Sequence, residues 1–333
     1  MRITATIFAA ATALAASVPA AAQVADTTCR TYLQGPRFVG AAADLARLVD
    51  LQDSTSHASF VLRRSGRGYS GNACAAPAAV GDLARHLGTA APDNGVRLLA
   101  PELLVVGNSA YPRDWNDGVL WGGRGLNTVI TVGAEVAWSV FSAAVAPAFA
   151  WQSNREFDIQ PNPDTARSEF AYRWRAGIDA PQRFGAESFT RFDPGQSFAR
   201  VDVRGFGAGV STENIQWGPM RRNPILLSGT AGGFTHAFIE TQRPVDIWIG
   251  DLEFQAFWGQ LEESDYFDDE PDNDRRMLAG LLVALQPRVL DGLTIGGGRL
   301  QAMTWWPELS TIDLALKPYR GIGENPRGRG GDN

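Results

Sequence analysis

The chain has 333 residues, of which 44% are hydrophobic and 20% charged, and its formal net charge is −6. It contains no basic block, so nucleic acid is not an expected partner. Beyond residue 22, polar or charged residues interrupt every apolar run before it reaches about 18 residues, which excludes a transmembrane helix. A secreted soluble protein or a β-barrel remains, because only helices and closed barrels satisfy their backbone inside lipid.

The N-terminus has the pattern of a cleaved Sec signal peptide. Met1-Arg2 is a short positive start, an uncharged apolar run follows from Ile3 to Val18, and Ala20-Ala21-Ala22 offers a cleavage site before Gln23. The apolar run is too short for a spanning helix. We therefore predict that residues 1–22 are removed on export.

The next segment, residues 23–96, is rich in alanine and predicts a small, mostly helical periplasmic domain. Two stretches, Ala41 to Leu51 and Ala78 to Leu87, place leucines at helical spacing. Both cysteines, Cys29 and Cys74, lie in this segment. An oxidising compartment favours a disulfide between them, which would contribute about 4 kcal/mol in the chain-entropy model. A metal site is the weaker alternative, because no histidine lies at ligand spacing from either cysteine.

From about Val96 onward the period of the apolar residues changes to two, which predicts strands. Residues 126–138 alternate between an apolar face and a face of polar or small residues. After a two-residue break at Ser139-Val140, the alternation resumes over residues 141–151. Each strand of this hairpin ends in an aromatic residue, as a membrane interface favours.

The same alternation returns at residues 245–258, where Gly250-Asp251 is predicted as a two-residue hairpin turn. Strands of about ten residues, with tight turns at one end and long connections at the other, are typical of bacterial outer-membrane barrels. The charged strand residues Glu135, Asp246 and Glu253 are then expected to face the interior. The sequence predicts nine strands, near residues 97–106, 126–138, 141–151, 196–205, 207–212, 236–249, 252–261, 275–286 and 293–303.

Several connecting segments carry dense, unusual residues. They are Asn116 to Asn127, Pro181-Gln182-Arg183-Phe184-Gly185, Asp193-Pro194-Gly195-Gln196-Ser197, Ser211-Thr212-Glu213-Asn214, Trp217-Gly218-Pro219, Arg222-Asn223-Pro224, Gly232-Gly233-Phe234-Thr235-His236, Arg243-Pro244-Val245-Asp246, Glu263-Ser264-Asp265-Tyr266-Phe267 and Gln286-Pro287-Arg288. Together, over about residues 97–303, they resemble the capsule assembly Wzi family of outer-membrane proteins. The resemblance implies an 18-stranded outer-membrane barrel with a periplasmic helical bundle. It also implies a lectin-like role, in which the protein holds capsular polysaccharide at the surface of a Gram-negative cell.

The predicted fold is therefore an all-β, antiparallel transmembrane β-barrel with a small N-terminal helical domain. About nine of the expected 18 strands are present, in residues 97–303, as the N-terminal half of the barrel. Members of the family continue past the point where this chain stops. Residues 304–333 are accordingly expected to be a loop, or the truncated C-terminus of a fragment.

The predicted function is binding of capsular or other surface polysaccharide, in support of capsule attachment and assembly; a porin with no specific glycan binding is the alternative. Trp faces stack on sugar rings, and Arg side chains pair with uronic carboxylates. The same residue types also pack loops into a plug, and that alternative stays open for each residue. The candidate polysaccharide-binding residues are Trp115, Asn116, Asp117, Trp121, Arg124, Arg183, Asn214, Trp217, Arg221 and Arg222.

Neither a catalytic site nor a metal site is expected. Residues 262–274 hold eight acidic side chains but lack the spacing of an EF-hand loop, so a solvated loop is favoured over a Ca²⁺ site. No serine-nucleophile or zinc motif accompanies His236, which is expected to be structural. Glu213 with Glu240 is a glycosidase pair only in the sense that any sequence offers one. We expect a monomer in outer-membrane lipid that is no enzyme and uses no cofactor.

Overall fold

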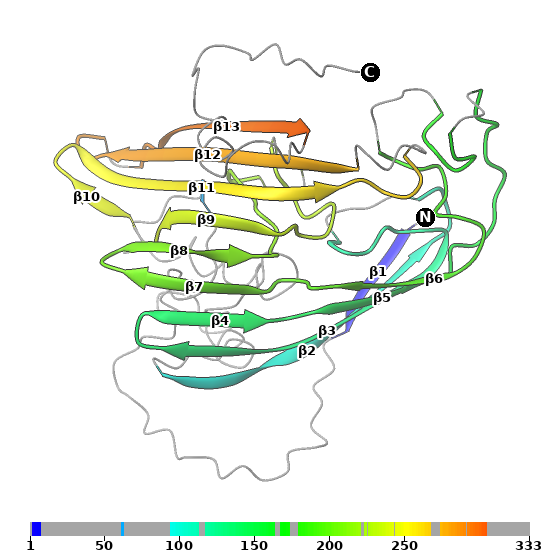
Figure 1. Ribbon diagram of the computed structural model, residues 1–333, viewed down its shortest axis with the longest axis horizontal. Coiled ribbons are helices and arrows are strands. Elements are labelled where there is room, and N and C mark those ends of the chain that lie inside the picture. Colours follow the sequence, from blue (N-terminus) through cyan, green and yellow to red (C-terminus); the bar gives the residue numbers. More distant parts are fainter. Residues whose placement is uncertain are drawn as a thin grey trace, which may run out of the picture.

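The computed structural model describes residues 2–7, 61–62, 94–112, 117–163, 167–173, 179–220, 223–224, 226–242, 244–267, 274–290 and 292–304. These residues contain no helix and form thirteen strands in one antiparallel sheet (Figure 1). No helix suited to crossing a membrane occurs among them. The sheet is open, with the order β1-β2-β3-β4-β7-β8-β9-β11-β12-β13, while β5, β6 and β10 branch from this path.

The strands range from three to fourteen residues. They are β1 Arg2–Ile7, β2 Gly95–Asn108, β3 Gly125–Trp138, β4 Phe141–Val145, β5 Ala148–Gln152, β6 Phe189–Asp193, β7 Phe198–Val203, β8 Phe206–Ser211, β9 His236–Thr241, β10 Val245–Ile247, β11 Gly250–Glu262, β12 Arg275–Pro287 and β13 Ile295–Thr304. The all-β, antiparallel prediction is confirmed for the described residues. Neither a closed barrel nor a place in a membrane follows from the open sheet.

The predicted count of nine strands is wrong because two predicted strands are divided and two short strands, β1 and β6, were not predicted. The predicted strand 141–151 breaks at Ala146-Pro147, where proline cannot donate to a ladder; β4 then pairs with β7, whereas β5 pairs with β3 and β6. The predicted strand 236–249 divides into β9 and β10 ahead of Pro244. The hairpin turn expected at residues 250–251 lies instead at Trp248-Ile249, because Ile247 pairs with Gly250.

Much of the N-terminal prediction lies outside the described residues. This holds for the helical domain apart from residues 61–62 and 94–96, for Cys29 and Cys74, and for residues 305–333. Strand β1 falls within the predicted signal peptide and pairs with the edge of β2. Cleavage after residue 22 would therefore remove β1 and leave that edge of β2 open.

Short turns and long connections leave opposite ends of the sheet, as predicted (Figure 1). Two-residue turns join β3 to β4, β7 to β8 and β10 to β11. In the β7–β8 turn, Arg204 and Gly205 both have positive φ, 51° and 89°, as a type I′ turn requires. The connections after β2, β5, β8 and β11 are long, and we call their side of the molecule the long-loop end.

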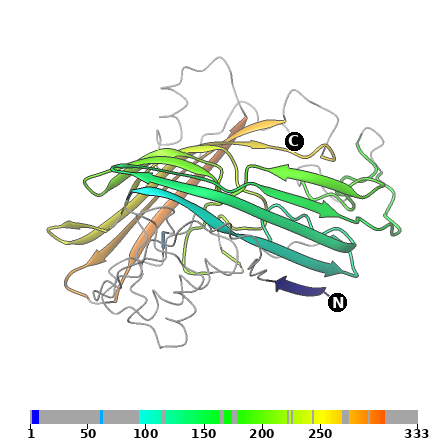
Figure 2. The same ribbon diagram turned by 90° about the horizontal axis from the view of Figure 1, so that it is seen from below.

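The two faces of the sheet differ in polarity in the way that the alternation predicts. On β3 the face of Ile130 and Trp138 is exposed, and we call it the outer face. The opposite, inner face carries Asn127 and Glu135, both buried. Cross-strand partners continue the outer face: Ile130 lies opposite Phe149, and Phe149 opposite Phe192, all three exposed. Figure 2 shows how strongly the sheet twists, with β12 and β13 crossing the direction of β2 and β3.

Candidate functional site

The inner face of the sheet is covered by the protein's own connecting segments, in two buried apolar clusters. In the first, Val119 and Leu120 from the connection between β2 and β3 pack on Val106 and Val129 of those strands. The amide of Gly118 donates a 2.8 Å hydrogen bond to the carbonyl of Gly229. The connection after β8, residues 212–235, therefore lies against the connection after β2.

The second cluster centres on Trp217, one of the predicted binding residues. Its indole packs with Leu62 and edge-on against Phe257 of β11, with ring centroids 5.6 Å apart. The amide of Gly218 donates to the carbonyl of Val61 at 2.8 Å. Residues 61–62 of the N-terminal segment thus pack on the inner face of the sheet, against the loop of Trp217.

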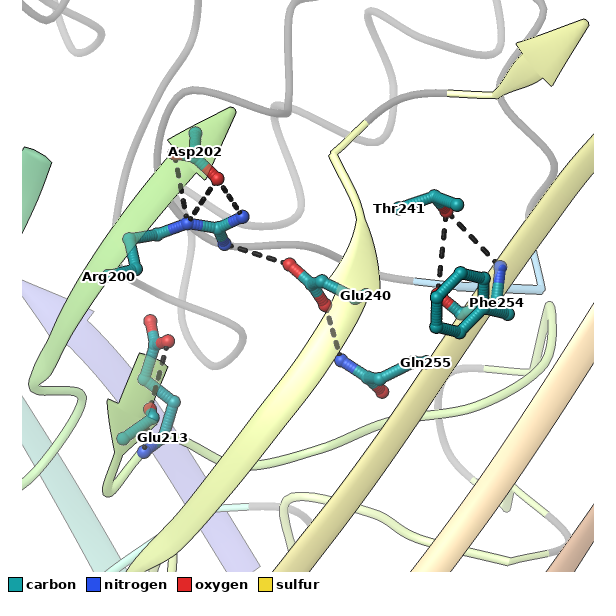
Figure 3. A network of polar contacts seen from close by, with 8 residues as sticks. Arg200, Asp202, Glu213, Glu240, Thr241, Phe254 and Gln255 are labelled. Carbon is teal, nitrogen blue, oxygen red and sulfur yellow. Dashed lines mark hydrogen bonds and ion pairs between the residues drawn. The ribbon is translucent and has the colours of Figure 1, made fainter. Parts of the chain in front are cut away.

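A chain of buried polar contacts connects the loop of Trp217 to the sheet. Figure 3 shows its part on the strands, from Arg200 and Asp202 through Glu240 to Gln255. Arg200 of β7 donates to both carboxylate oxygens of Asp202 and, at 2.8 Å, to Glu240 of β9. Glu240 accepts a 2.7 Å hydrogen bond from Gln255 of β11. Gln255 in turn accepts one of 2.7 Å from the indole of Trp217. We call Arg200, Asp202, Glu240 and Gln255 the inner-wall network.

Glycines on β8 make the inner-wall network possible. Strand β8 lies between β7 and β9, so the Arg200 side chain must cross it to reach Glu240. Gly207 lies opposite both Asp202 and Glu240 in the register. A Cβ at Gly207 would lie 2.2 Å from Nη2 of Arg200, so only glycine leaves room for the guanidinium.

All four residues of the network are buried, and the Arg200 side chain is 0% exposed. A second inner-face ion pair joins Arg97 of β2 to the buried Glu135 of β3. Glu253 of β11 is also buried on this face, whereas Asp246 shares the face but is exposed near the β10–β11 turn, where it ion-pairs with Arg288. The prediction that the charged strand residues face inward is therefore confirmed for Glu135 and Glu253, with Asp246 outside the covered region.

Near the long-loop end, aromatic rings and an arginine gather around Trp121. The guanidinium of Arg191, from β6, lies 4.5 Å from the centroid of the Trp121 ring. The rings of Phe184 and Phe189 lie 4.8 and 5.8 Å from the same residue. Trp121 is only half-buried, so part of its surface stays open to a ligand. We call these four residues the Trp121 cluster.

Arg183 and Arg124 hold the loops beside this cluster. Arg183 is buried, donates from Nε to the carbonyl of Gly185 at 2.8 Å, and lies over the ring of Phe170. Arg124 donates to the carbonyl of Glu156 at 3.2 Å and stays partly exposed. These bonds fix the loop backbone, and Arg124 keeps donors available to solvent.

The predicted binding residues thus fall into three groups. Asp117, Trp121 and Arg124 are half-buried and belong to the same connection before β3. Asn214, Trp217 and Arg183 are buried, and Asn214 donates to the carbonyl of Ala231 at 2.8 Å within its own loop. Trp115, Asn116, Arg221 and Arg222 lie outside the described residues.

Asp117 also lines a cavity of about 110 Å³ on the inner side of the sheet. Its walls come from β2, β3, β5 and β6 and from the segments around Gly195 and Gly232. Asp193 of β6 is the buried carboxylate among the lining residues. Three segments singled out in the sequence, around Asp117, Asp193 and Gly232, line it, but they lie far apart along the chain, so their meeting could not be predicted.

The acidic connection after β11 is described only in part, because residues 268–273 lie outside the described residues. Within the described part of the chain, no group of three or more His, Cys, Asp or Glu residues is arranged to hold a metal ion. Ser264 donates to Asp179, which links this connection to the one after β5. Burial, helped by the nearby carboxylate of Asp265, raises the pKa of Tyr266, whose ring packs edge-on against Phe170.

The remaining titratable candidates have structural contacts. His236 begins β9, is buried beside Phe234 and Phe257, and shares a 2.7 Å hydrogen bond with the carbonyl of Phe234. Glu240 belongs to the inner-wall network, and Glu213 accepts a hydrogen bond from Ser211. The carboxylates of Glu213 and Glu240 therefore have different hydrogen-bond partners.

The chain matches no protein-family model, no curated protein and no solved structure. The described residues present an exposed apolar outer face, an inner face covered by loops, the half-buried Trp121 cluster and a carboxylate-lined cavity.

Proposed function

We propose that this chain is an outer-membrane protein that binds capsular or other surface polysaccharide and supports capsule attachment. The observation that carries the proposal is the apolar, exposed outer face of the sheet, opposite an inner face whose polar and apolar side chains are both covered by loops. A sheet in water buries its apolar face, whereas a sheet in lipid turns that face outward. Export by the N-terminal signal peptide and the resemblance to the capsule assembly Wzi family belong to the same proposal.

The placing of the aromatic residues supports the membrane part of the proposal. Trp138 ends β3 beside a two-residue turn, and Trp151 lies towards the opposite end of the sheet, on β5. Both are exposed, and both lie on the outer face by register. Tryptophan and tyrosine favour the two interfaces of a bilayer, where one side of the ring is apolar and the other wet.

The Trp121 cluster supports the polysaccharide part of the proposal. An indole held in place by Phe184 and Arg191 is a pre-ordered platform for a sugar ring, and Arg124 beside it supplies donors for hydroxyl or carboxylate oxygens. The alternative, a porin, needs a water-filled interior. In the described residues the inner face is instead packed with apolar side chains around Leu120 and Trp217.

The test is binding of capsular polysaccharide, extracted from the organism that encodes the chain, to the protein in lipid vesicles. We expect Trp121→Ala to weaken binding by roughly two- to tenfold, the equivalent of about 0.5–1.5 kcal/mol for an aromatic contact. Trp248→Ala is the matched control, because Trp248 is 91% exposed in the β10–β11 turn, away from the long-loop end. Equal binding by wild type and Trp121→Ala, or conductance in planar bilayers without polymer binding, would contradict the proposal.

A further inference from the structure

Arg191 is a half-buried arginine whose guanidinium has neither a hydrogen bond nor an ion pair among the described residues. It lies on the inner face of β6, opposite the buried Ala150 of β5. Its guanidinium is stacked 4.5 Å from the centroid of the Trp121 ring, and Nη1 is buried without a partner. An arginine side chain carries five N–H donors and a permanent charge, so burial without an acceptor costs free energy.

The acidic neighbour on the same strand does not supply that acceptor. Asp193 interacts electrostatically with Arg191, so the charge of the guanidinium is partly compensated. Within the described part of the chain, however, no hydrogen bond or ion pair joins the two side chains, and Oδ1 of Asp193 accepts a 2.7 Å hydrogen bond from the amide of Gly195. The donors of Arg191 therefore remain available to another group.

A second donor without an acceptor lies on the adjacent strand. Gln152 of β5 is 0% exposed; its Oε1 accepts a 3.5 Å hydrogen bond from the amide of Gly123, but its Nε2 has no partner. It follows Ala150, the register partner of Arg191, by two residues on the same face. Oδ1 of Asn127, opposite Gln152 on β3, accepts no hydrogen bond from it. Two neighbouring strands thus each present a donor that lacks an acceptor.

The missing acceptor is best matched by a carboxylate on a ring. The planar fork of a guanidinium fits a carboxylate through two parallel N–H···O bonds. Of the guanidinium nitrogens of Arg191, Nη1 alone is fully buried, so the edge formed by Nε and Nη2 can meet a ligand. Trp121 is only half-buried, so its indole keeps surface for a sugar ring beside that edge.

We propose that Arg191 binds the carboxylate of an acidic sugar residue whose ring contacts Trp121. The proposal rests on the function proposed above and names its substrate class, a surface polysaccharide that contains uronic acids. Arg191 is then the residue that selects acidic over neutral sugars. A small carboxylate such as acetate offers the same charge without a ring, and the experiment separates the two.

The experiment measures binding of three compounds by calorimetry, at pH 7, to the protein in phosphatidylcholine vesicles. They are tetragalacturonic acid, its full methyl ester and acetate. We expect the acid, which is ionised at this pH, to bind at least tenfold more tightly than the ester, which keeps the rings but has no charge. Acetate should also bind at least tenfold more weakly, because it makes no contact with Trp121. Equal binding of acid and ester, acetate binding as tight as that of the acid, or no binding of the acid would overturn the proposal.

Variants of Arg191 test whether it acts on the ligand or only holds Trp121 in place. We expect Arg191→Gln to weaken binding of the acid at least tenfold and to leave the weak binding of the ester unchanged, because the ester forms no ion pair. Arg191→Lys keeps the charge but not the planar fork, so a smaller loss is expected. Trp121→Ala should weaken acid and ester alike. Arg204→Gln, in the exposed β7–β8 turn, is the matched control and should bind as wild type does.

Two results from the Arg191 variants would contradict the proposal, provided that the near-ultraviolet circular dichroism is like that of wild type. One is unchanged binding of the acid by Arg191→Gln. The other is an equal loss of acid and ester binding, which would mean that Arg191 only supports the Trp121 ring.

Failure of this proposal is distinguishable from failure of the proposed function. If extracted polymer binds in a Trp121-dependent way but Arg191→Gln does not weaken that binding, the acidic-sugar site fails and the proposed function stands. If tetragalacturonic acid binds in an Arg191-dependent way but the extracted polymer does not bind, the acidic-sugar site stands and the proposed function fails.

Discussion

The outer and inner faces of the same strands follow opposite rules of burial. On β3 the apolar Ile130 is 49% exposed, while two of its polar inner-face residues, Asn127 and Glu135, are 0% and 2% exposed. A β-strand alternates its side chains between two faces, so one sequence pattern supplies both. The difference shows that internal packing takes place on the polar side of this sheet, against loops such as those of Leu120 and Trp217.

The inner face is stabilised by buried ion pairs as well as by apolar contacts. The Arg200 side chain has charged partners on its own strand and on β9, and none of its surface reaches water. Among the described residues the outer face has no buried ion pair, and its contacts include apolar rings such as those of Phe149 and Phe192, whose centroids are 5.1 Å apart. Substitutions on the two faces should therefore differ in size and in their dependence on solvent.

The largest effect is expected from Arg200→Met. It leaves Asp202 and Glu240 buried without their cation, and breaking a buried pair in this way costs about 3–5 kcal/mol. The free energy of unfolding from urea titrations in lipid vesicles is the measurement. A triple variant that also carries Asp202→Leu and Glu240→Leu should recover most of the loss, because no unpaired charge remains. A loss below about 1 kcal/mol for Arg200→Met would mean that water reaches the inner wall.

The next effect tests the outer face. Ile130→Arg places a charge near the middle of β3, where a lipid-facing strand loses about 2–4 kcal/mol. On an exposed surface in water the same change is worth within about 0.5 kcal/mol. Comparison of the unfolding free energy with that of Thr190→Arg, near the end of the outer face of the short β6, sharpens the test. Two equal and small values would place the outer face in water.

Strand existence could be predicted from sequence wherever alternation was long and unbroken, as in β3 and β11. Which strands pair could not be predicted, because no local sequence feature indicates that β4 pairs with β7 while β5, after Pro147, pairs with β6. Strand β6 has five residues, which is too short for a periodic signal. The burial of charged residues could be predicted from the alternation, since Glu135 and Glu253 lie opposite the apolar face of their strands.

The site was less predictable than the fold. Trp121, Arg183 and Trp217 stood out by residue type, but whether a loop tryptophan is half-buried or fully buried depends on which loop folds over it. The inner-wall network joins residues 40 positions apart across an intervening strand. Its one sequence signal is the alternation of Gly207 and Gly209 on β8, which leaves the inner face of that strand without side chains ahead of Ser211.

Gly207→Ala is expected to cost about 1–3 kcal/mol, the range for overpacking a filled site. The new methyl group would meet Nη2 of Arg200, which cannot move aside without leaving Asp202 or Glu240. Gly297→Ala, on β13, is the matched control, because a Cβ there meets nothing within 4 Å. The midpoints of urea unfolding of the two variants measure the difference, and equal midpoints would mean that a methyl group fits at position 207 without displacing Arg200.

The smallest effect is expected from Asp246→Asn, which removes the ion pair between Asp246 and Arg288. Its N–O distance is like that of the buried Asp202–Arg200 pair, but it lies on the exposed part of the same face. Asp246 and Arg288 lie 2.5 Å apart with side chains 70% and 60% exposed, whereas Asp202 and Arg200 are 5% and 0% exposed. Exposed pairs contribute about 0–1 kcal/mol, and salt screens them. We therefore expect a loss within that range in dilute buffer that disappears in about 1 M salt, while the loss from Arg200→Met persists. A salt-insensitive loss of several kcal/mol for Asp246→Asn would show that this end of the inner face is covered too, because burial rather than geometry separates the two pairs.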